Sequence, residues 1–207
     1  VTGEIVGTYA VAEDMSAITE STLSCTVEGD SVTGAKIAVP DAELATHSVV
    51  LVKGAKGPEL RLVELNSTEV EISLQKNLDK SRSFYKVAFN NAQSSLLGDQ
   101  GSGWESHVHI MDQAAVLFAF EQVGGSQQAL DMAKEYAMER YAFGRQIGSY
   151  QAIKHKLADM YVAVTLAKSN CYYGAWALSS ESSELPLAAA TSRVSATKAF
   201  QLCAKEN

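Results

Sequence analysis

The chain has 207 residues with a formal net charge of −7, and 46% of them are hydrophobic and 20% charged, the balance of a protein that buries a core. This composition excludes a disordered or collagen-like chain, and the acidic charge argues against a protein whose main ligand is nucleic acid. No stretch reaches the roughly 18 consecutive apolar residues of a membrane span, and the first residues do not resemble a signal peptide. The sequence therefore predicts a soluble globular protein.

The cysteines and histidines indicate neither disulfides nor a metal site. Cys25, Cys171 and Cys203 are odd in number and far apart, so we expect no disulfide framework and a reducing compartment, the cytoplasm. His107 and His109 are two residues apart and would lie on different sides of a helix, whereas helical ligands of one metal lie at i and i+4. We expect no bound metal.

The composition changes half-way along the chain. Residues 1–100 hold 24 Val, Ile or Thr and 10 Ala. Residues 101–207 hold 12 Val, Ile or Thr and 19 Ala, so the composition shifts from strand-forming to helix-forming residues. The formal charge changes as well, from −6 in the first half to −1 in the second. Three glycines within residues 98–103 mark the boundary. We therefore predict a β-domain over 1–100 and a helical-bundle domain over 101–207.

The first half consists of short apolar runs separated by turns. Glu28-Gly29-Asp30 predicts a tight hairpin turn between two strands. The expected strands cover residues 23–27, 31–39, 48–52, 60–65, 70–74 and 83–89. Strands at a spacing of roughly ten residues are typical of a small antiparallel β-barrel or β-sandwich.

The second half has the apolar spacing of helices. The expected helices cover residues 104–142, 150–178 and about 186–207. The apolar spacing of the first is interrupted only by Gly124-Gly125, and we expect this helix to end at Gly144. We expect the last to reach Asn207 without a stop signal, as in a chain that is cut there. Ala-rich faces on long helices predict an antiparallel bundle. The predicted fold class is α+β, with the β-domain followed by the helical bundle.

The most informative stretch joins the first two helices. Residues 139–160 read ERYAFGRQIGSYQAIKHKLADM. On local grounds alone, Gly144 would cap the preceding helix in the left-handed conformation, and Arg140 and Arg145 would lie near its negative end. Phe143 would pack on the turn. Any connection between two helices could have these features.

The whole string, however, resembles the corresponding segment of the acyl-CoA dehydrogenase family, whose pattern is Arg-x-x-Phe-Gly, an apolar residue and then Gln-Ala-Ile. That family also places a β-domain before a helical bundle. The resemblance implies FAD as cofactor, an acyl-CoA substrate, an electron-transferring flavoprotein as partner, and a homo- or hetero-tetramer. It also implies that Arg140 binds the FAD pyrophosphate across a subunit interface, where a guanidinium suits phosphate oxygens. The residues implied to line the adenine half are Phe143, Ile147, Tyr150 and Gln151.

The β-half departs from the family pattern where the flavin ring would lie. Ala12 and Asp14 stand on either side of Glu13 where the family has Thr and Pro. Residues 38–41 read AVPD where the family has Trp-Ile-Thr-Asn. Ala38 and Pro40 supply neither an indole nor a hydroxyl, and proline also lacks a backbone donor. We therefore expect a degenerate flavin-ring site in this chain.

The substrate side also differs from the family. Asp112 begins a segment that resembles the family's Asp-x-x-Arg, whose arginine helps to hold coenzyme A, but the arginine position is Ala115 here. The resemblance implies that Asp112 binds the acyl-CoA substrate, whereas on local grounds it would be a solvated helix residue. The resemblance places the catalytic glutamate beyond Asn207, so no catalytic residue is assigned. Glu13 and Glu139 are expected to be structural.

Three functions remain open at this point. The first is FAD-dependent α,β-dehydrogenation of an acyl-CoA thioester, in fatty acid or lipid metabolism. The second is a non-catalytic structural subunit of a hetero-oligomeric acyl-CoA dehydrogenase that contributes to a partner's FAD site. The third is a binding module unrelated to flavins, which the absence of a flavin absorption band in the purified protein would favour.

Overall fold

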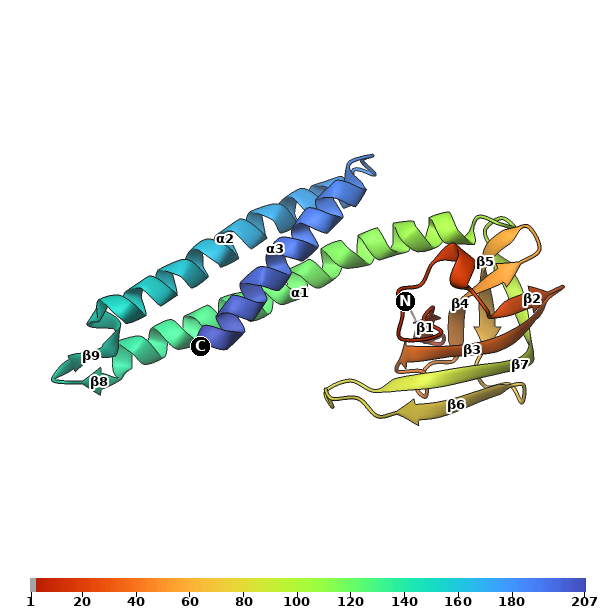
Figure 1. Cartoon of the computed structure of the whole chain (residues 1–207), viewed down its shortest axis with the longest axis horizontal. Coiled ribbons are helices and arrows are strands. Elements are labelled where there is room, and N and C mark those ends of the chain that lie inside the picture. Colours follow the sequence, from red (N-terminus) through yellow and green to blue (C-terminus); the bar gives the residue numbers. More distant parts are fainter. Residues whose placement is uncertain (1–2) are drawn as a thin grey trace. The chain divides into compact units, whose positions relative to one another are not determined.

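The computed structural model describes residues 3–207, which form two compact units, one ending at Val108 and the other extending from His109 to Asn207 (Figure 1). The first unit contains a short 3-10 turn, Glu20–Thr22, and seven strands. These strands are β1 (Gly7–Ala10), β2 (Thr26–Glu28), β3 (Ser31–Pro40), β4 (His47–Gly54), β5 (Gly57–Glu64), β6 (Val70–Gln75) and β7 (Phe84–Leu97).

The strands of the first unit close into a small barrel. β3 pairs with β2 and β7, β7 with β5, and β5 with β4, all antiparallel, and one parallel residue pair between β2 and β4 closes the ring. β1 extends the sheet by pairing in parallel with β4, and β6 runs antiparallel to the first part of β7. The predicted fold class and the barrel are confirmed, but the sheet is mixed rather than purely antiparallel. Parallel pairing arises because long stretches of chain, not tight turns, separate β1 and β2 from β4.

The hairpin predicted at residues 28–30 is confirmed. Glu28 and Ser31 are paired, so Gly29 and Asp30 form a two-residue turn between β2 and β3. Gly29 has a φ of +60°, the left-handed conformation that glycine adopts without a steric penalty. This short-range signal fixed the register of the first hairpin.

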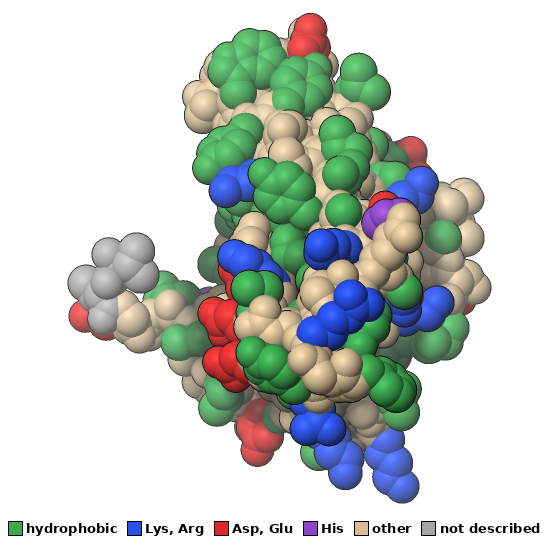
Figure 2. Space-filling model, turned by 90° about the vertical axis from the view of Figure 1, so that its left-hand side faces the viewer, with side chains coloured by type: hydrophobic (Ala, Val, Ile, Leu, Met, Phe, Trp, Pro, Cys, Tyr) green, Lys and Arg blue, Asp and Glu red, His purple; other side chains and the backbone are tan. Residues whose placement is uncertain are grey.

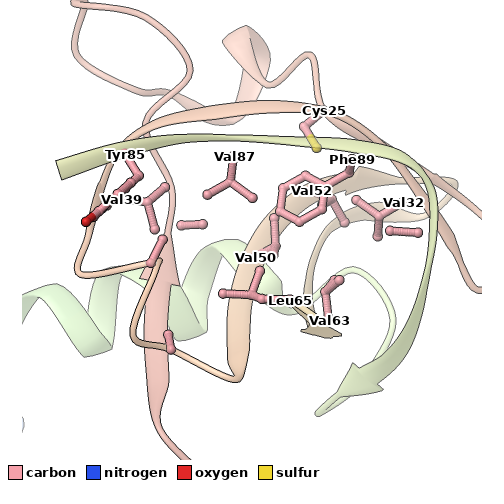
Figure 3. Packing of buried hydrophobic residues seen from close by; sticks show 14 of the residues in the cluster. Cys25, Val32, Val39, Val50, Val52, Val63, Leu65, Tyr85, Val87 and Phe89 are labelled. Carbon is pink, nitrogen blue, oxygen red and sulfur yellow. The ribbon is translucent and has the colours of Figure 1, made fainter. Parts of the chain in front are cut away.

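Valine and aromatic side chains fill the barrel (Figure 3). Val32, Val39, Val50 and Val87 are fully buried, and the Phe89 ring lies among them with 1% of its surface exposed. β-branched and aromatic residues suit a pleated, buried surface, which explains their enrichment in the first half of the sequence. The barrel therefore has its own hydrophobic core.

Three long helices follow the strands, as predicted: α1 (Gly103–Glu139), α2 (Gln151–Ser179) and α3 (Leu185–Glu206). The first residues of α1 belong to the first unit, and the helices build the second unit from His109 onward. Small buried side chains allow the helices to approach closely, namely Ala119, Ala167, Cys171, Ala196 and Ala199. A Cβ at Gly174 would lie 2.5 Å from Ser192 Oγ, so α2 and α3 are in tight contact there. Among residues 3–207 no helix combines the length and the hydropathy that a transmembrane segment requires.

The expected end of α1 is wrong, because the helix ends at Glu139 rather than at Gly144. The helix continues through Gly124-Gly125, where the apolar spacing is interrupted. Gly125 is accommodated because a Cβ there would lie 2.7 Å from the Phe200 ring of α3, so packing between helices favours glycine at this position. The glycine pair thus lies where α1 and α3 approach closely, and it does not break α1.

The connection between α1 and α2 is a β-hairpin. β8 (Tyr141–Ala142) pairs with β9 (Arg145–Gln146), and a 3-10 turn, Ile147–Ser149, leads into α2. Phe143 and Gly144 are the two turn residues, with φ of +51° and +76°. Two successive left-handed residues are typical of a type I′ hairpin. Gly144 is therefore left-handed as expected, but it belongs to a hairpin turn and the helix-capping interpretation is wrong.

Candidate functional site

The β8–β9 hairpin and the start of α2 bring the predicted flavin contacts together within twelve residues. Arg140 directly precedes β8 and is exposed, and Phe143 at the hairpin tip has 97% of its surface exposed. Gln151 is the first residue of α2, with its amide nitrogen 3.4 Å from His155 Nε2. The tip presents an apolar ring to solvent beside polar and cationic groups.

Several contacts fix the hairpin to the helices. The Ile147 N–H donates to the Arg140 carbonyl oxygen at 2.8 Å, and a Cβ at Gly148 would lie 2.9 Å from the Ala137 carbonyl oxygen. The Tyr150 hydroxyl donates to the Ala142 carbonyl oxygen at 2.9 Å. The hairpin is therefore anchored on the last turn of α1 and on the beginning of α2.

Ile147 and Tyr150 face the protein more than the solvent. Ile147 lines an apolar cavity of about 380 Å³ between α1 and α2, together with Tyr136 and Leu157. The guanidinium carbon of Arg145 lies 4.0 Å from the centre of the Tyr150 ring, a cation–π contact. The implied roles of these two residues at a flavin stay predictions.

Charge is unevenly distributed around the hairpin. Residues 140–158 contain four cationic residues and no Asp or Glu, in a chain whose net charge is −7. Figure 2 faces this end of the helical unit and shows Lys and Arg side chains among hydrophobic ones, with Asp and Glu side chains beside them. Of the four cations, Lys156 is paired with Glu206. Among residues 3–207, Arg140 has no carboxylate within salt-bridge distance. An exposed, uncompensated guanidinium is free to bind an anion.

Asp112 lies far from this hairpin. It is half-buried on α1, and 27 residues of continuous helix separate it from Glu139, a distance of about 40 Å. The structure does not bring Asp112 together with the residues of the hairpin.

In the barrel, Glu13 forms a buried ion pair. Its Oε1 accepts a hydrogen bond from Lys36 Nζ at 2.6 Å, and the Lys36 side chain is fully buried. Glu13 also accepts hydrogen bonds from the Ser24 hydroxyl and from the Cys25 N–H. Burial raises the pKa of Glu13, but these hydrogen bonds outweigh it and hold the pKa below its usual range. The carboxylate is thus fully engaged inside the barrel.

The backbone around Ala38 is also engaged within the chain. The β3–β7 register shifts between Lys36 and Val39, and Ala38 is exposed with a φ of +51°. The Ala38 N–H donates to Gln75 Oε1 at 2.7 Å, and the Pro40 carbonyl oxygen accepts from the Thr8 hydroxyl at 2.6 Å. The side chains of Ala38 and Pro40 offer neither a hydrogen-bond donor nor an aromatic face. Residues 38–40 therefore do not fit the ring of a flavin.

A buried Tyr–His pair was missed by the sequence analysis. The Tyr9 hydroxyl lies 2.8 Å from His107 Nδ1, and the Trp104 ring lies 5.3 Å from the His107 ring. Burial raises the pKa of Tyr9 to about 12, and burial together with the Lys36 charge lowers the pKa of His107. Because 98 positions separate the two residues, no local pattern could have paired them.

The comparison with protein families decides the classification. The C-terminal domain of acyl-CoA dehydrogenases matches residues 101–207, just over half of the chain. The chain belongs to the acyl-CoA dehydrogenase family.

Curated relatives agree with this classification. The chain is 40% identical over 97 residues to acyl-CoA dehydrogenase IpdE2 of Mycobacterium tuberculosis, a match that covers 47% of this chain and 29% of that protein. It is 29% identical over 188 residues to mitochondrial isovaleryl-CoA dehydrogenase of Oryza sativa subsp. japonica, which covers 83% of this chain and 46% of the relative. The chain thus spans less than half the length of these acyl-CoA dehydrogenases.

Solved structures share the fold. An FAD-dependent dehydrogenase matches with a TM-score of 0.91 and 26% identity, over 99% of this chain and 59% of that one. Glutaryl-coenzyme A dehydrogenase in complex with glutaryl-CoA matches with a TM-score of 0.89 and 24% identity, over 98% of this chain and 55% of that one. The order of β-barrel and helices is therefore that of acyl-CoA dehydrogenases.

Proposed function

We propose that the chain is part of an acyl-CoA dehydrogenase that uses FAD for the α,β-dehydrogenation of an acyl-CoA thioester in fatty acid or lipid metabolism. The β8–β9 hairpin carries this proposal, because it combines an exposed ring, an exposed guanidinium and a surrounding stretch without acidic residues. Membership in the family and the likeness to an FAD-dependent dehydrogenase support it. An electron-transferring flavoprotein as electron acceptor, a tetrameric assembly and a cytoplasmic location belong to the same proposal.

In this proposal the hairpin binds FAD across a subunit interface. Arg140 would form charge-assisted hydrogen bonds to the pyrophosphate, and Phe143 and Gln151 would contact the adenine half. When bound, FAD would supply the acceptor for the hydride that leaves the β-carbon of the substrate. The chain's own part is to hold and orient the cofactor, since Glu13 is committed to Lys36 and cannot serve as a base.

Replacing Arg140 tests the proposal. Arg140→Ala should weaken FAD binding roughly 10- to 150-fold, the equivalent of losing about 1.5–3 kcal/mol of charged hydrogen bonds. It should change the free energy of unfolding by less than about 1 kcal/mol, because the side chain is exposed. FAD retained after gel filtration of the full-length protein and its melting temperature measure the two effects.

Lys154→Ala is the matched control, since it removes one positive charge from the same exposed surface. We expect it to leave FAD retention nearly unchanged. If Arg140→Ala retained FAD fully and lost only thermal stability, Arg140 would be a structural residue and the hairpin would not be a cofactor site.

The barrel supports a second candidate function, a non-catalytic subunit in a hetero-oligomer. Ala38 and Pro40 offer nothing to a flavin ring, whereas the hairpin keeps the features needed to reach a neighbour's cofactor. In this arrangement the chain would lend Arg140, Phe143 and Gln151 to a related partner whose barrel holds the ring. The flavin content of the purified assembly separates the two candidates.

A further inference from the structure

The β8–β9 hairpin is too small to hold its own shape. Each strand contributes only two residues, Tyr141–Ala142 and Arg145–Gln146. An isolated two-stranded hairpin is at best marginally stable in water, and here one of the turn residues is a phenylalanine in the left-handed conformation. Contacts from outside the hairpin must therefore keep it folded.

Tyr150 makes contacts with both strands at once. Its hydroxyl donates to the Ala142 carbonyl oxygen of β8 at 2.9 Å, and its ring lies under the Arg145 guanidinium of β9 at 4.0 Å. Ala142 and Arg145 are themselves a register pair, one on each side of the turn. One side chain thus holds the base of the turn from both sides.

The backbone of Tyr150 is fixed by the helix that follows it. Its carbonyl oxygen accepts hydrogen bonds from the N–H groups of Ile153 and Lys154, at 3.1 and 3.0 Å. Tyr150 occupies the position directly before α2, with φ −77° and ψ 135°. Its ring therefore projects from a rigid helix start back onto the hairpin.

We propose that Tyr150 and Arg145 form a latch that holds the hairpin in the conformation presenting Arg140 and Phe143. Tyr150 is then a positioning residue that acts through the hairpin, rather than a residue that lines the adenine. This inference rests on the proposed function, in which the hairpin binds FAD. Its physical basis is preorganisation, because a hairpin already ordered in the free protein loses less entropy when its ligand binds.

The two arginines of the hairpin consequently have different tasks. Both are exposed, but Arg145 lies over the Tyr150 ring, which leaves Arg140 as the one proposed to bind an anion. Stacking depends on the planar guanidinium, so Arg145→Lys would keep the charge and weaken the latch. By contrast, Arg140→Lys would keep the hairpin ordered.

Tryptic cleavage of the full-length protein after removal of FAD reports on the latch independently of the cofactor, because bound FAD would itself shield the hairpin. Trypsin cuts after Arg140 and Arg145, and both bonds are protected while the hairpin is ordered. Tyr150→Phe removes only the hydroxyl and should speed cleavage at these bonds roughly 2- to 12-fold, the equivalent of a hydrogen bond worth about 0.5–1.5 kcal/mol. The release of FAD should accelerate in the same variant by a similar factor.

Tyr141→Phe is the matched control, because it deletes a hydroxyl from an exposed tyrosine on the same hairpin. It should change neither cleavage nor FAD release. Arg145→Lys should resemble Tyr150→Phe in FAD release and in cleavage after Arg140, the bond whose own arginine is unchanged, whereas Arg140→Lys should leave the cleavage after Arg145 unchanged.

The outcomes distinguish the latch from the function on which it rests. Unchanged cleavage in Tyr150→Phe would overturn the latch, whatever happens to FAD. Faster cleavage with unchanged FAD release would overturn the positioning role of Tyr150. If Arg140→Ala also left FAD binding unchanged, the proposed function would fail as well, while faster cleavage in Tyr150→Phe would still show that Tyr150 orders the hairpin.

Discussion

At the scale of single residues, the barrel interior holds more ionisable groups than a valine-rich core usually does. Lys36 is fully buried against Glu13, and its charge contributes to the environment of His107. His107 is 6% exposed, and its Nδ1 atom is hydrogen-bonded to the Tyr9 hydroxyl. Burial lowers the pKa of Lys36, while the hydrogen bond to Glu13 opposes that effect.

The lowered pKa of His107 predicts loss of stability in mild acid. The folded protein binds a proton at His107 less readily than the unfolded chain does. The stabilising contribution of neutral His107 is therefore complete above the ordinary pKa of about 6.5 and is lost as the pH falls below it. Each pH unit in that window costs up to about 1.4 kcal/mol for this group. Urea unfolding at pH 7.5 and 5.5, followed by Trp104 fluorescence in a Trp176→Phe background, measures the loss.

His107→Asn supplies the comparison. The asparagine Oδ1 can accept the Tyr9 hydroxyl hydrogen bond at nearly the position of Nδ1, but it does not titrate. The variant should lose clearly less stability than the wild type between pH 7.5 and 5.5, whereas His155→Asn on the exposed face of α2 should behave like the wild type. An equal acid loss in His107→Asn and wild type would mean that His107 is not its source.

At the scale of elements, local patterns predicted well wherever the contacts are local. The turn at Gly29-Asp30 follows from its residues, and α2 was expected over 150–178 and observed over Gln151–Ser179. The parallel pairing of β1 with β4 and the Tyr9–His107 contact depend on residues far apart in sequence, so no periodicity indicated them. The β8–β9 hairpin was missed because strands of two residues have no period to detect.

The candidate site was also predicted only as far as its local sequence allowed. The resemblance identified the stretch from Arg140 to Gln151, and the structure brings these residues together at the end of one helical unit. That Tyr150 contacts Ala142 and Arg145 could not be predicted, because it depends on how the turn folds back on α2. Side-chain direction, rather than residue identity, was the missing information.

The glycine pair in α1 gives a matched prediction at this scale. A Cβ at Gly124 would meet nothing within 4 Å, whereas a Cβ at Gly125 would lie 2.7 Å from the Phe200 ring. Gly124→Ala should therefore stabilise the helical unit by about 0.5–1 kcal/mol through lower backbone entropy in the unfolded chain. Gly125→Ala should give no gain or a loss, because the ring must move.

Urea unfolding followed by circular dichroism at 222 nm compares the two variants. Equal gains at both positions would show that Phe200 does not pack against α1 as described. A loss at Gly124 would indicate that this face of α1 is covered in the assembled protein.

At the scale of the whole molecule, the second candidate function gives the two units different tasks toward a cofactor. The barrel lacks ring contacts at Ala38 and Pro40, while the hairpin of the helical unit is ordered and exposed. In a homo-oligomer each cofactor would need both surfaces from copies of the same chain. A hetero-oligomer would let a related subunit supply the missing surface, and two-fold symmetric packing makes such an exchange possible.

Counting flavin per chain tests this assembly. If the chain is the non-catalytic subunit of the second candidate, the full-length protein should co-purify with a related subunit and hold one FAD for every two chains, measured by flavin absorbance against protein concentration. In that case the protein expressed alone should hold little FAD. Near-complete occupancy in a homo-oligomer would contradict the hetero-oligomer and would require another explanation of how residues 38–40 meet the ring.

The conformation of Phe143 has a consequence for selection experiments. A non-glycine residue at φ +51° costs on the order of 1 kcal/mol, so glycine or asparagine at this position would make the isolated chain more heat-resistant. A library of variants selected for heat resistance would therefore be enriched in substitutions of Phe143. The selected variants would lack the aromatic ring at the tip of the hairpin. Screening the same library for flavin colour would favour the original phenylalanine. The residue kept at position 143 would therefore show whether selection for stability or selection for flavin binding has shaped the sequence.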